Sequence, residues 1–135
     1  MKLLEQVQEI FSAFEFKPID CGEYKNIYKL IQDNPDIIND YKSDITDSYL
    51  NNKFNKHIPP RWYGFDIGSP IVKDWVIIIE KVIDLCIAND PNFEIHQIKL
   101  KFGMICFYCE TELIEDIRDI NSLIMNTFYD KALIY

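Results

Sequence analysis

The sequence FEIHQIKLKFGMICFYCE, residues 93–110, predicts a β-hairpin. Its two runs, 93–100 and 104–109, are rich in the β-branched and aromatic residues that favour strands. The break between them, Lys101-Phe102-Gly103, places a glycine where a tight turn needs one. A two-stranded hairpin is marginal in water by itself, so helices must cover its apolar face.

Apolar periodicity predicts such helices on both sides of the hairpin. Ser69-Pro70 offers an N-cap and a first-turn proline for a helix over 70–89. Its apolar positions cover more than one stripe, which indicates a central helix packed on several sides. Thr111 can cap a second helix over 112–127. Its apolar face carries Leu113, Ile117, Ile120 and Ile124.

Short helices are expected in the first third of the chain. The spacing of apolar residues predicts helices over 2–15 and 22–33, and Asn34-Pro35 can open a short one. Ser43 or Asp44 can cap the next helix. Its expected inward residues are Ile45, Tyr49, Leu50 and Phe54.

Residues 55–69, NKHIPPRWYGFDIGS, interrupt this pattern with two prolines and two glycines and are expected to form a loop. Its aromatic side chains either pack against the core, which we expect, or stay exposed for a partner. Residues 132–135 suit a short last strand.

The elements together predict a single α+β domain over 1–135, with helices packed on a small antiparallel sheet built on the 93–109 hairpin. It comprises a helical front part, 1–55, an aromatic loop, 56–69, and a helix–hairpin–helix unit, 70–127.

The chain is acidic, with a formal charge of -8 over 135 residues. This charge disfavours direct binding to nucleic acid or anionic membranes, because phosphate contacts need Lys and Arg. Two segments, 33–47 and 110–119, each carry five carboxylates against one basic residue. Such segments either steer a basic partner or form a solvated face that keeps the protein in solution.

The start of the chain, MKLLEQVQEIF, lacks the apolar core of a signal peptide. No apolar run reaches the roughly 18 residues that a membrane span needs. We therefore expect a cytoplasmic protein whose four cysteines stay reduced.

Cys106 and Cys109 form the most conspicuous chemical motif, a C-x2-C. Residues three apart on a strand face opposite sides, and Cys21 and Cys86 supply no second pair of metal ligands. We therefore expect buried thiols, and neither a metal nor a cofactor.

Other polar residues suggest weaker candidates. His57 and Asp66 lie in the aromatic loop, and His96 lies in the first hairpin run. Asp66 can form a polar site or, as we favour, an ion pair with Arg61 that orders the loop. Lys99 and Lys101 can hold an anion, but such lysines more often block aggregation of an edge strand.

A Pro-rich Trp/Phe loop, a helix ending in Leu-Cys and a QIKLKFGMICFY hairpin resemble a family of small uncharacterised proteins from prophages and mobile elements of bacteria. The resemblance covers residues 58–109. The matching positions are Pro59, Pro60, Trp62, Phe65, Gly68, Leu85, Cys86, Gln97, Ile98, Lys99, Lys101, Phe102, Gly103, Ile105, Phe107 and Tyr108.

The chain departs from the family pattern in three places. Trp75 lies farther from Leu85-Cys86 than in the family, Cys106 replaces the usual arginine, and the cysteine-containing C-terminal tail is missing. The family has no established activity, so the resemblance implies a fold and a genomic setting.

These observations favour a non-enzymatic acidic protein that neutralises another protein, as an immunity protein or a phage-encoded inhibitor of host defence does. Two alternatives stay open: a small enzyme that uses the 57–66 loop with His57, Asp66 or a cysteine, and a structural helper that dimerises through exposed aromatics. The expected partner is a protein with a basic surface. The candidate contact residues are Asp36, Asp40, Asp44, Trp62, Tyr63, Glu112, Glu115 and Asp119.

Overall fold

The hairpin forms where the sequence indicates, in a computed structural model that describes residues 2–15, 22–24, 27–37, 39, 46–67, 73–101 and 104–130. Strand β2 (Glu94–Lys101) pairs antiparallel with strand β3 (Met104–Glu110). Four predicted features lie outside the described residues: the glycine turn at 102–103, the caps at 43–44, the helix start at 69–72 and the strand at 132–135.

A third strand, β1 (Gly64–Asp66), corrects the predicted loop and makes the sheet mixed, in the order β1-β2-β3. It runs parallel to β2, with Phe65 opposite Ile98. Both of these side chains are buried. Three residues are too few for an alternating pattern to mark a strand, so only the pairing with β2 defines it.

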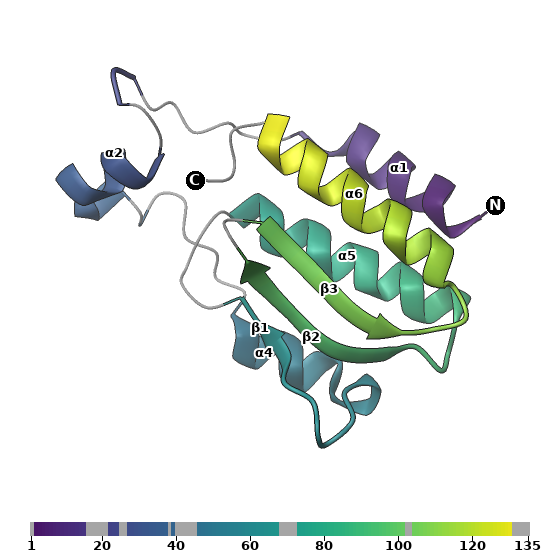
Figure 1. Ribbon diagram of the computed structural model, residues 1–135. Coiled ribbons are helices and arrows are strands. Elements are labelled where there is room, and N and C mark those ends of the chain that lie inside the picture. The colour runs from purple at the N-terminus through teal and green to yellow at the C-terminus, as the bar shows by residue number, and fades with distance from the viewer. Residues whose placement is uncertain are drawn as a thin grey trace.

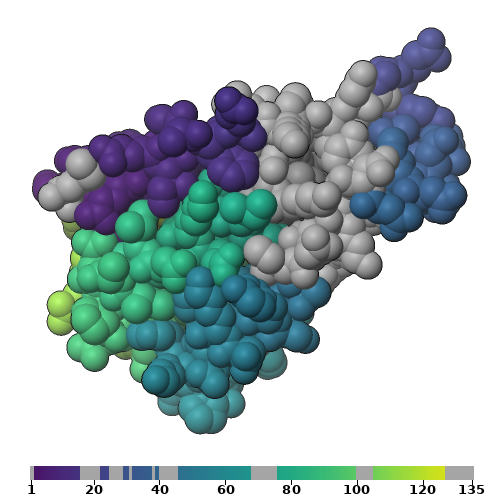
Figure 2. Space-filling view, turned by 180° about the vertical axis from the view of Figure 1, so that it is seen from behind, coloured from purple at the N-terminus to yellow at the C-terminus, as the bar shows by residue number. Residues whose placement is uncertain are grey.

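Helices cover one face of this sheet, which confirms the predicted α+β class (Figure 1). Helix α5 (Lys73–Asn89) lies directly behind the strands, and α6 (Ile114–Asp130) contacts β3. Helix α1 (Leu3–Ala13) contacts both α5 and α6. Seen from behind, α1 lies along one side of α5, and the segment that contains α4 (Asp47–Lys53) lies along the other (Figure 2).

The predicted apolar faces meet in one core between these helices and the sheet. Ile78, Ile79, Val82 and Ile83 of α5 are wholly inaccessible to solvent, as a central helix requires. From α6, Ile117, Ile120 and Ile124 enter the same core.

The described residues of the first third of the chain form helices in the predicted regions, with some differences in detail. Helix α2 (Ile27–Asp33) is followed by a single 3-10 turn, η1 (Pro35–Ile37). Helix α4 begins later than expected because the Thr46 side chain accepts a hydrogen bond from the backbone N–H of Tyr49. Tyr49 was expected to point inward but is 48% exposed, whereas Leu50 is fully buried. A further 3-10 turn, η2 (Asn55–His57), follows α4.

Helix α4 protects the open edge of β1 with two side chains one helical turn apart. The Asn51 amide accepts a 2.7 Å hydrogen bond from the Phe65 N–H and donates a 3.0 Å bond to the Phe65 carbonyl. Asp47 accepts from the Ile67 N–H at 3.1 Å. These contacts replace the backbone partners that an edge strand lacks.

None of the helices within the described ranges is both long enough and apolar enough to cross a membrane.

Candidate functional site: the open face of the sheet

The face of the sheet opposite α5 has no described helix or strand in front of it (Figure 1). We call this surface the open face and define it by the outward side chains of β2 and β3 together with Trp62 and Tyr63. A bulge between Ile95 and Gln97 shifts the pairing of β2, so that Ile95 and Ile98 both point into the core. His96 and Gln97 consequently both face outward.

The aromatic loop is anchored on His96. The rings of Trp62 and His96 stack with their centroids 4.2 Å apart and their planes 10° from parallel. The backbone N–H of Tyr63 donates to the His96 carbonyl at 3.0 Å. The Arg61 guanidinium lies 5.7 Å from the centroid of the Trp62 ring. These contacts fix the loop against β2 and cover one side of the His96 imidazole.

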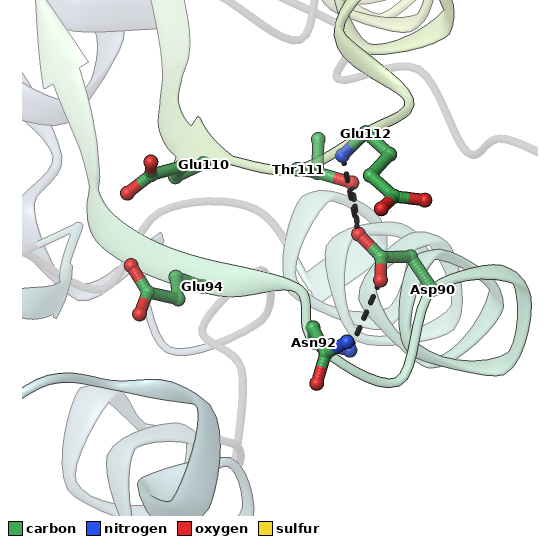
Figure 3. A pocket seen from close by; sticks show the side chains of 6 residues that line it. All are labelled: Asp90, Asn92, Glu94, Glu110, Thr111 and Glu112. Carbon is green, nitrogen blue, oxygen red and sulfur yellow. Dashed lines mark hydrogen bonds between the residues drawn. The ribbon is translucent and has the colours of Figure 1, made fainter.

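Two carboxylates converge on the same imidazole. Glu94 and Glu110 are direct cross-strand partners, and their side chains extend side by side from the two strands, away from Asp90 (Figure 3). The Nε2 atom of His96 lies 3.3 Å from Glu94 Oε2 and 3.7 Å from Glu110 Oε2. Like charges directly opposite each other destabilise a strand pair, so this arrangement favours a cation between them.

Asp90 has a structural role in the groove that it lines together with Asn92, Glu94, Glu110, Thr111 and Glu112. Its carboxylate accepts hydrogen bonds from the Thr111 hydroxyl at 2.5 Å, the Asn92 N–H at 3.0 Å and the Glu112 N–H at 3.3 Å (Figure 3). The Thr111 hydrogen bond is the main reason that the pKa of Asp90 is lowered. The carboxylate therefore ties the end of α5 to the start of α6.

Trp62 stacks on β2, Tyr108 lies on the outer side of β3, and Tyr63 follows Trp62 in the loop. Trp62, Tyr63 and Tyr108 are 36%, 72% and 42% exposed. The Lys99 ammonium lies 5.7 Å from the centroid of the Tyr108 ring. Tyr108 was not among the contact residues predicted from sequence, although its position on a strand between Phe107 and Cys109, which both pack against the core, would have placed it on the outer side.

Asp66 and Arg61 both lie in the described part of the chain, and they do not form the predicted ion pair. Asp66 accepts a 3.3 Å hydrogen bond from the Gln97 side chain. This bond joins β1 to β2 on the open face, and Arg61 packs over Trp62.

The remaining predicted contact residues lie elsewhere. Asp36 is exposed on η1, whereas residues 40 and 44 lie outside the described part of the chain. Glu112, Glu115 and Asp119 are exposed around the first turns of α6. The structure therefore stacks Trp62 on His96 and joins the backbone of Tyr63 to the same residue, whereas Glu112 lines a pocket together with Glu94 and Glu110.

The candidate catalytic residues of the loop lie far apart. His57 Nδ1 is 2.9 Å from the Phe93 carbonyl oxygen, so this nitrogen carries the proton and donates it. Asp66 lies opposite Lys99, which comes six residues after Phe93 in the chain. At the rise of a β-strand this separation is about 20 Å.

The cysteines of the C-x2-C motif face opposite sides of β3, as predicted. Cys109 lies opposite the buried Ile95, and Cys106 lies opposite Lys99 of the open face. Burial raises the pKa of Cys86 to about 12 and also raises that of Cys109. Both thiols are therefore poor nucleophiles at neutral pH.

Comparison of the chain with protein-family models, with curated proteins and with solved structures finds no match. The fold and the site define a small α+β protein with an aromatic sheet face bordered by carboxylates. The function is therefore argued from this face.

Proposed function

We propose that this protein is a non-enzymatic binding protein that neutralises another protein, and that the open face of its sheet is the contact surface. The observation that carries the proposal is the group of three exposed aromatic side chains, Trp62, Tyr63 and Tyr108. Tryptophan and tyrosine dominate the residues whose truncation weakens protein interfaces most.

The anchoring of the Trp62 ring and of the Tyr63 backbone also supports a binding role. Trp62 is stacked on His96, and the backbone of Tyr63 is hydrogen-bonded to β2. Side chains that are held in place before binding lose less conformational entropy when the complex forms.

The carboxylates that border the open face favour basic groups on the partner, next to the two cations, Arg61 and Lys99, that lie over the rings. Asp66, Glu94 and Glu110 border the open face, and the whole chain carries a charge of -8. Carboxylates at the rim of an interface accelerate encounter with a positively charged surface and disfavour acidic partners.

The sequence resemblance supports neutralisation as the consequence of binding. The resemblance implies a prophage or mobile-element setting, to which immunity proteins and phage-encoded inhibitors of host defence belong. An acidic protein that covers a basic functional surface would inhibit it by occlusion alone.

A partner is first isolated from the source cell by affinity capture on the tagged protein. Direct binding is then verified with purified components. Trp62→Ala, Tyr63→Ala and Tyr108→Ala should each weaken the affinity at least about tenfold if these rings are interface anchors. Tyr49→Ala is the matched control, because Tyr49 is 48% exposed but contacts Glu80 on the helical side.

Co-expression tests the consequence of binding. Wild-type protein should relieve the activity or toxicity of the partner, and the three open-face variants should do so less effectively. Unchanged binding by all three variants would place the contact surface elsewhere. Binding without any loss of partner activity would retain the contact surface and reject neutralisation.

A further inference from the structure

One imidazole nitrogen and two carboxylate oxygens converge on the open face. The ligand atoms of Glu94, His96 and Glu110 all lie within 4.8 Å of one another, and no ion is present. The His96 nitrogen is 3.3 Å and 3.7 Å from the two carboxylates. Neighbouring ligands of a tetrahedral zinc ion with bonds of about 2.1 Å are roughly 3.4 Å apart. We infer that Glu94, His96 and Glu110 bind a divalent transition-metal ion of the zinc class.

The backbone places these three ligands. Glu94 and His96 are two residues apart on one strand, and Glu110 lies opposite Glu94 on the next. The Trp62 ring covers one face of the imidazole, and the Tyr63 N–H fixes the backbone at His96. The His96 side chain is 17% exposed, whereas that of Glu110 is 70% exposed. The nitrogen ligand is therefore held in position, and Glu110 is free to close onto an ion.

The donor set selects the kind of ion. Imidazole nitrogen suits zinc and related transition metals, whereas magnesium and calcium prefer sites built from oxygen alone. Three protein ligands leave a fourth position for water, which the exposure of Glu110 permits. A dication would also neutralise the two opposed carboxylates.

Calorimetry on metal-stripped protein tests the site directly, without any partner, so its result is independent of the proposed function. Zinc chloride should bind at one equivalent per chain. Glu94→Gln, Glu110→Gln and His96→Phe should each weaken binding at least about tenfold, because even residues that only orient a ligand contribute about that much. Phenylalanine keeps a ring beneath Trp62.

Two variants serve as matched controls. Glu112→Gln removes the same charge from a carboxylate that lines the same groove, and Cys106→Ser removes the thiol of the open face. Both should bind zinc within about twofold of the wild type, since neither belongs to the donor set. Far-UV circular dichroism and the melting temperature establish that each variant is folded.

Cobalt identifies the ligands in the unmodified protein. Co²⁺ should give visible bands of a four-coordinate site without the intense near-ultraviolet absorption of cobalt–thiolate bonds. Absence of saturable binding in the micromolar range would overturn the inference. So would zinc binding that survives in folded Glu94→Gln and His96→Phe, or that is lost only in Cys106→Ser.

Discussion

At Gly64 the backbone has a φ of +68°, and an added Cβ would lie 2.4 Å from Asn51 Oδ1 and 2.9 Å from Ile58 Cδ1. Gly64→Ala therefore combines backbone strain with displacement of the Asn51 amide, and we expect a loss of about 2–4 kcal/mol in the free energy of unfolding. Gly22→Ala is the matched control, since Gly22 has a φ of +56° and an added Cβ there would meet no described atom within 4 Å. Urea unfolding should show only the backbone cost there, about 1–2 kcal/mol. Equal losses at both positions would mean that the crowding at Gly64 has no energetic effect.

Asp90 should make stability depend on pH. Hydrogen bonds, above all from Thr111, lower the pKa of the folded-state carboxyl below its unfolded value of about 3.9. The stabilisation is therefore fully present above that value and is lost as pH falls through the folded pKa. Asp90→Asn should lower the free energy of unfolding by about 1–3 kcal/mol at neutral pH, and the difference from wild type should shrink in acid. Asp36→Asn, at an exposed position, is the control in urea unfolding at each pH. A difference that stays constant down to pH 2 would contradict this role.

At the scale of elements, Asn51 links α4 to the sheet by replacing a neighbouring strand. Asn51→Ala would leave the N–H and the carbonyl of Phe65 without these partners, and we expect a loss of about 2–3 kcal/mol. Asn52→Ala makes the same change at an exposed position of the same helix and should stay within about 0.5 kcal/mol of wild type. Hydrogen exchange at the Phe65 amide should accelerate only in the first variant. Unchanged protection would show that the hydrogen bond to Asn51 is not what protects this amide.

The two faces of β3 should respond differently to truncation. Phe107 is 6% exposed and Tyr108 is 42% exposed, on opposite sides of one strand. Phe107→Ala should cost about 3–5 kcal/mol because it empties part of the core. Tyr108→Ala should cost less than about 1 kcal/mol and instead weaken partner binding. Thermal unfolding measures the first effect, and equal losses for the two variants would contradict the assignment of the faces.

At the scale of the whole molecule, the uneven distribution of negative charge predicts which surface steers association. Glu112 lines the groove beside Glu94 and Glu110, so reversing Glu112, Glu115 and Asp119 together should slow association with a basic partner. The second set, Asp36, Asp40 and Asp44, provides a control of equal charge. Raising salt should reduce the difference, because exposed charges are screened within about 10 Å at 0.1 M.

The control for this experiment is stability. Reversing Glu112, Glu115 and Asp119, which are exposed, should not change it by as much as about 1 kcal/mol per charge, since exposed charges contribute little. If both sets associate at the wild-type rate in low salt, the acidic segments are solvated faces that do not steer association. The contact would then depend on the aromatic rings alone.

The sequence by itself determined the elements whose buried residues recur at a regular spacing along the chain: α1, α5, α6 and the hairpin. A helix or strand that packs on a core must place apolar residues at its own period, so Ile117, Ile120 and Ile124 identify their face without knowledge of the neighbours. The bulge also left a signal, because the apolar residues of β2 change from odd positions at Ile95 to even ones at Ile98. That change of parity would have placed His96 and Gln97 on the same side.

Only the tertiary structure decided β1, the edge contact by Asn51 and the open face. Gly64–Asp66 is too short for a period and becomes a strand by pairing with residues more than thirty positions away. His96 looked isolated in sequence because its neighbours, Trp62 and Glu110, come from other segments. Local patterns record whether a side chain is buried, since that depends on the period of its own element. They do not record which distant groups it meets, because the register between segments is set only when the whole chain packs.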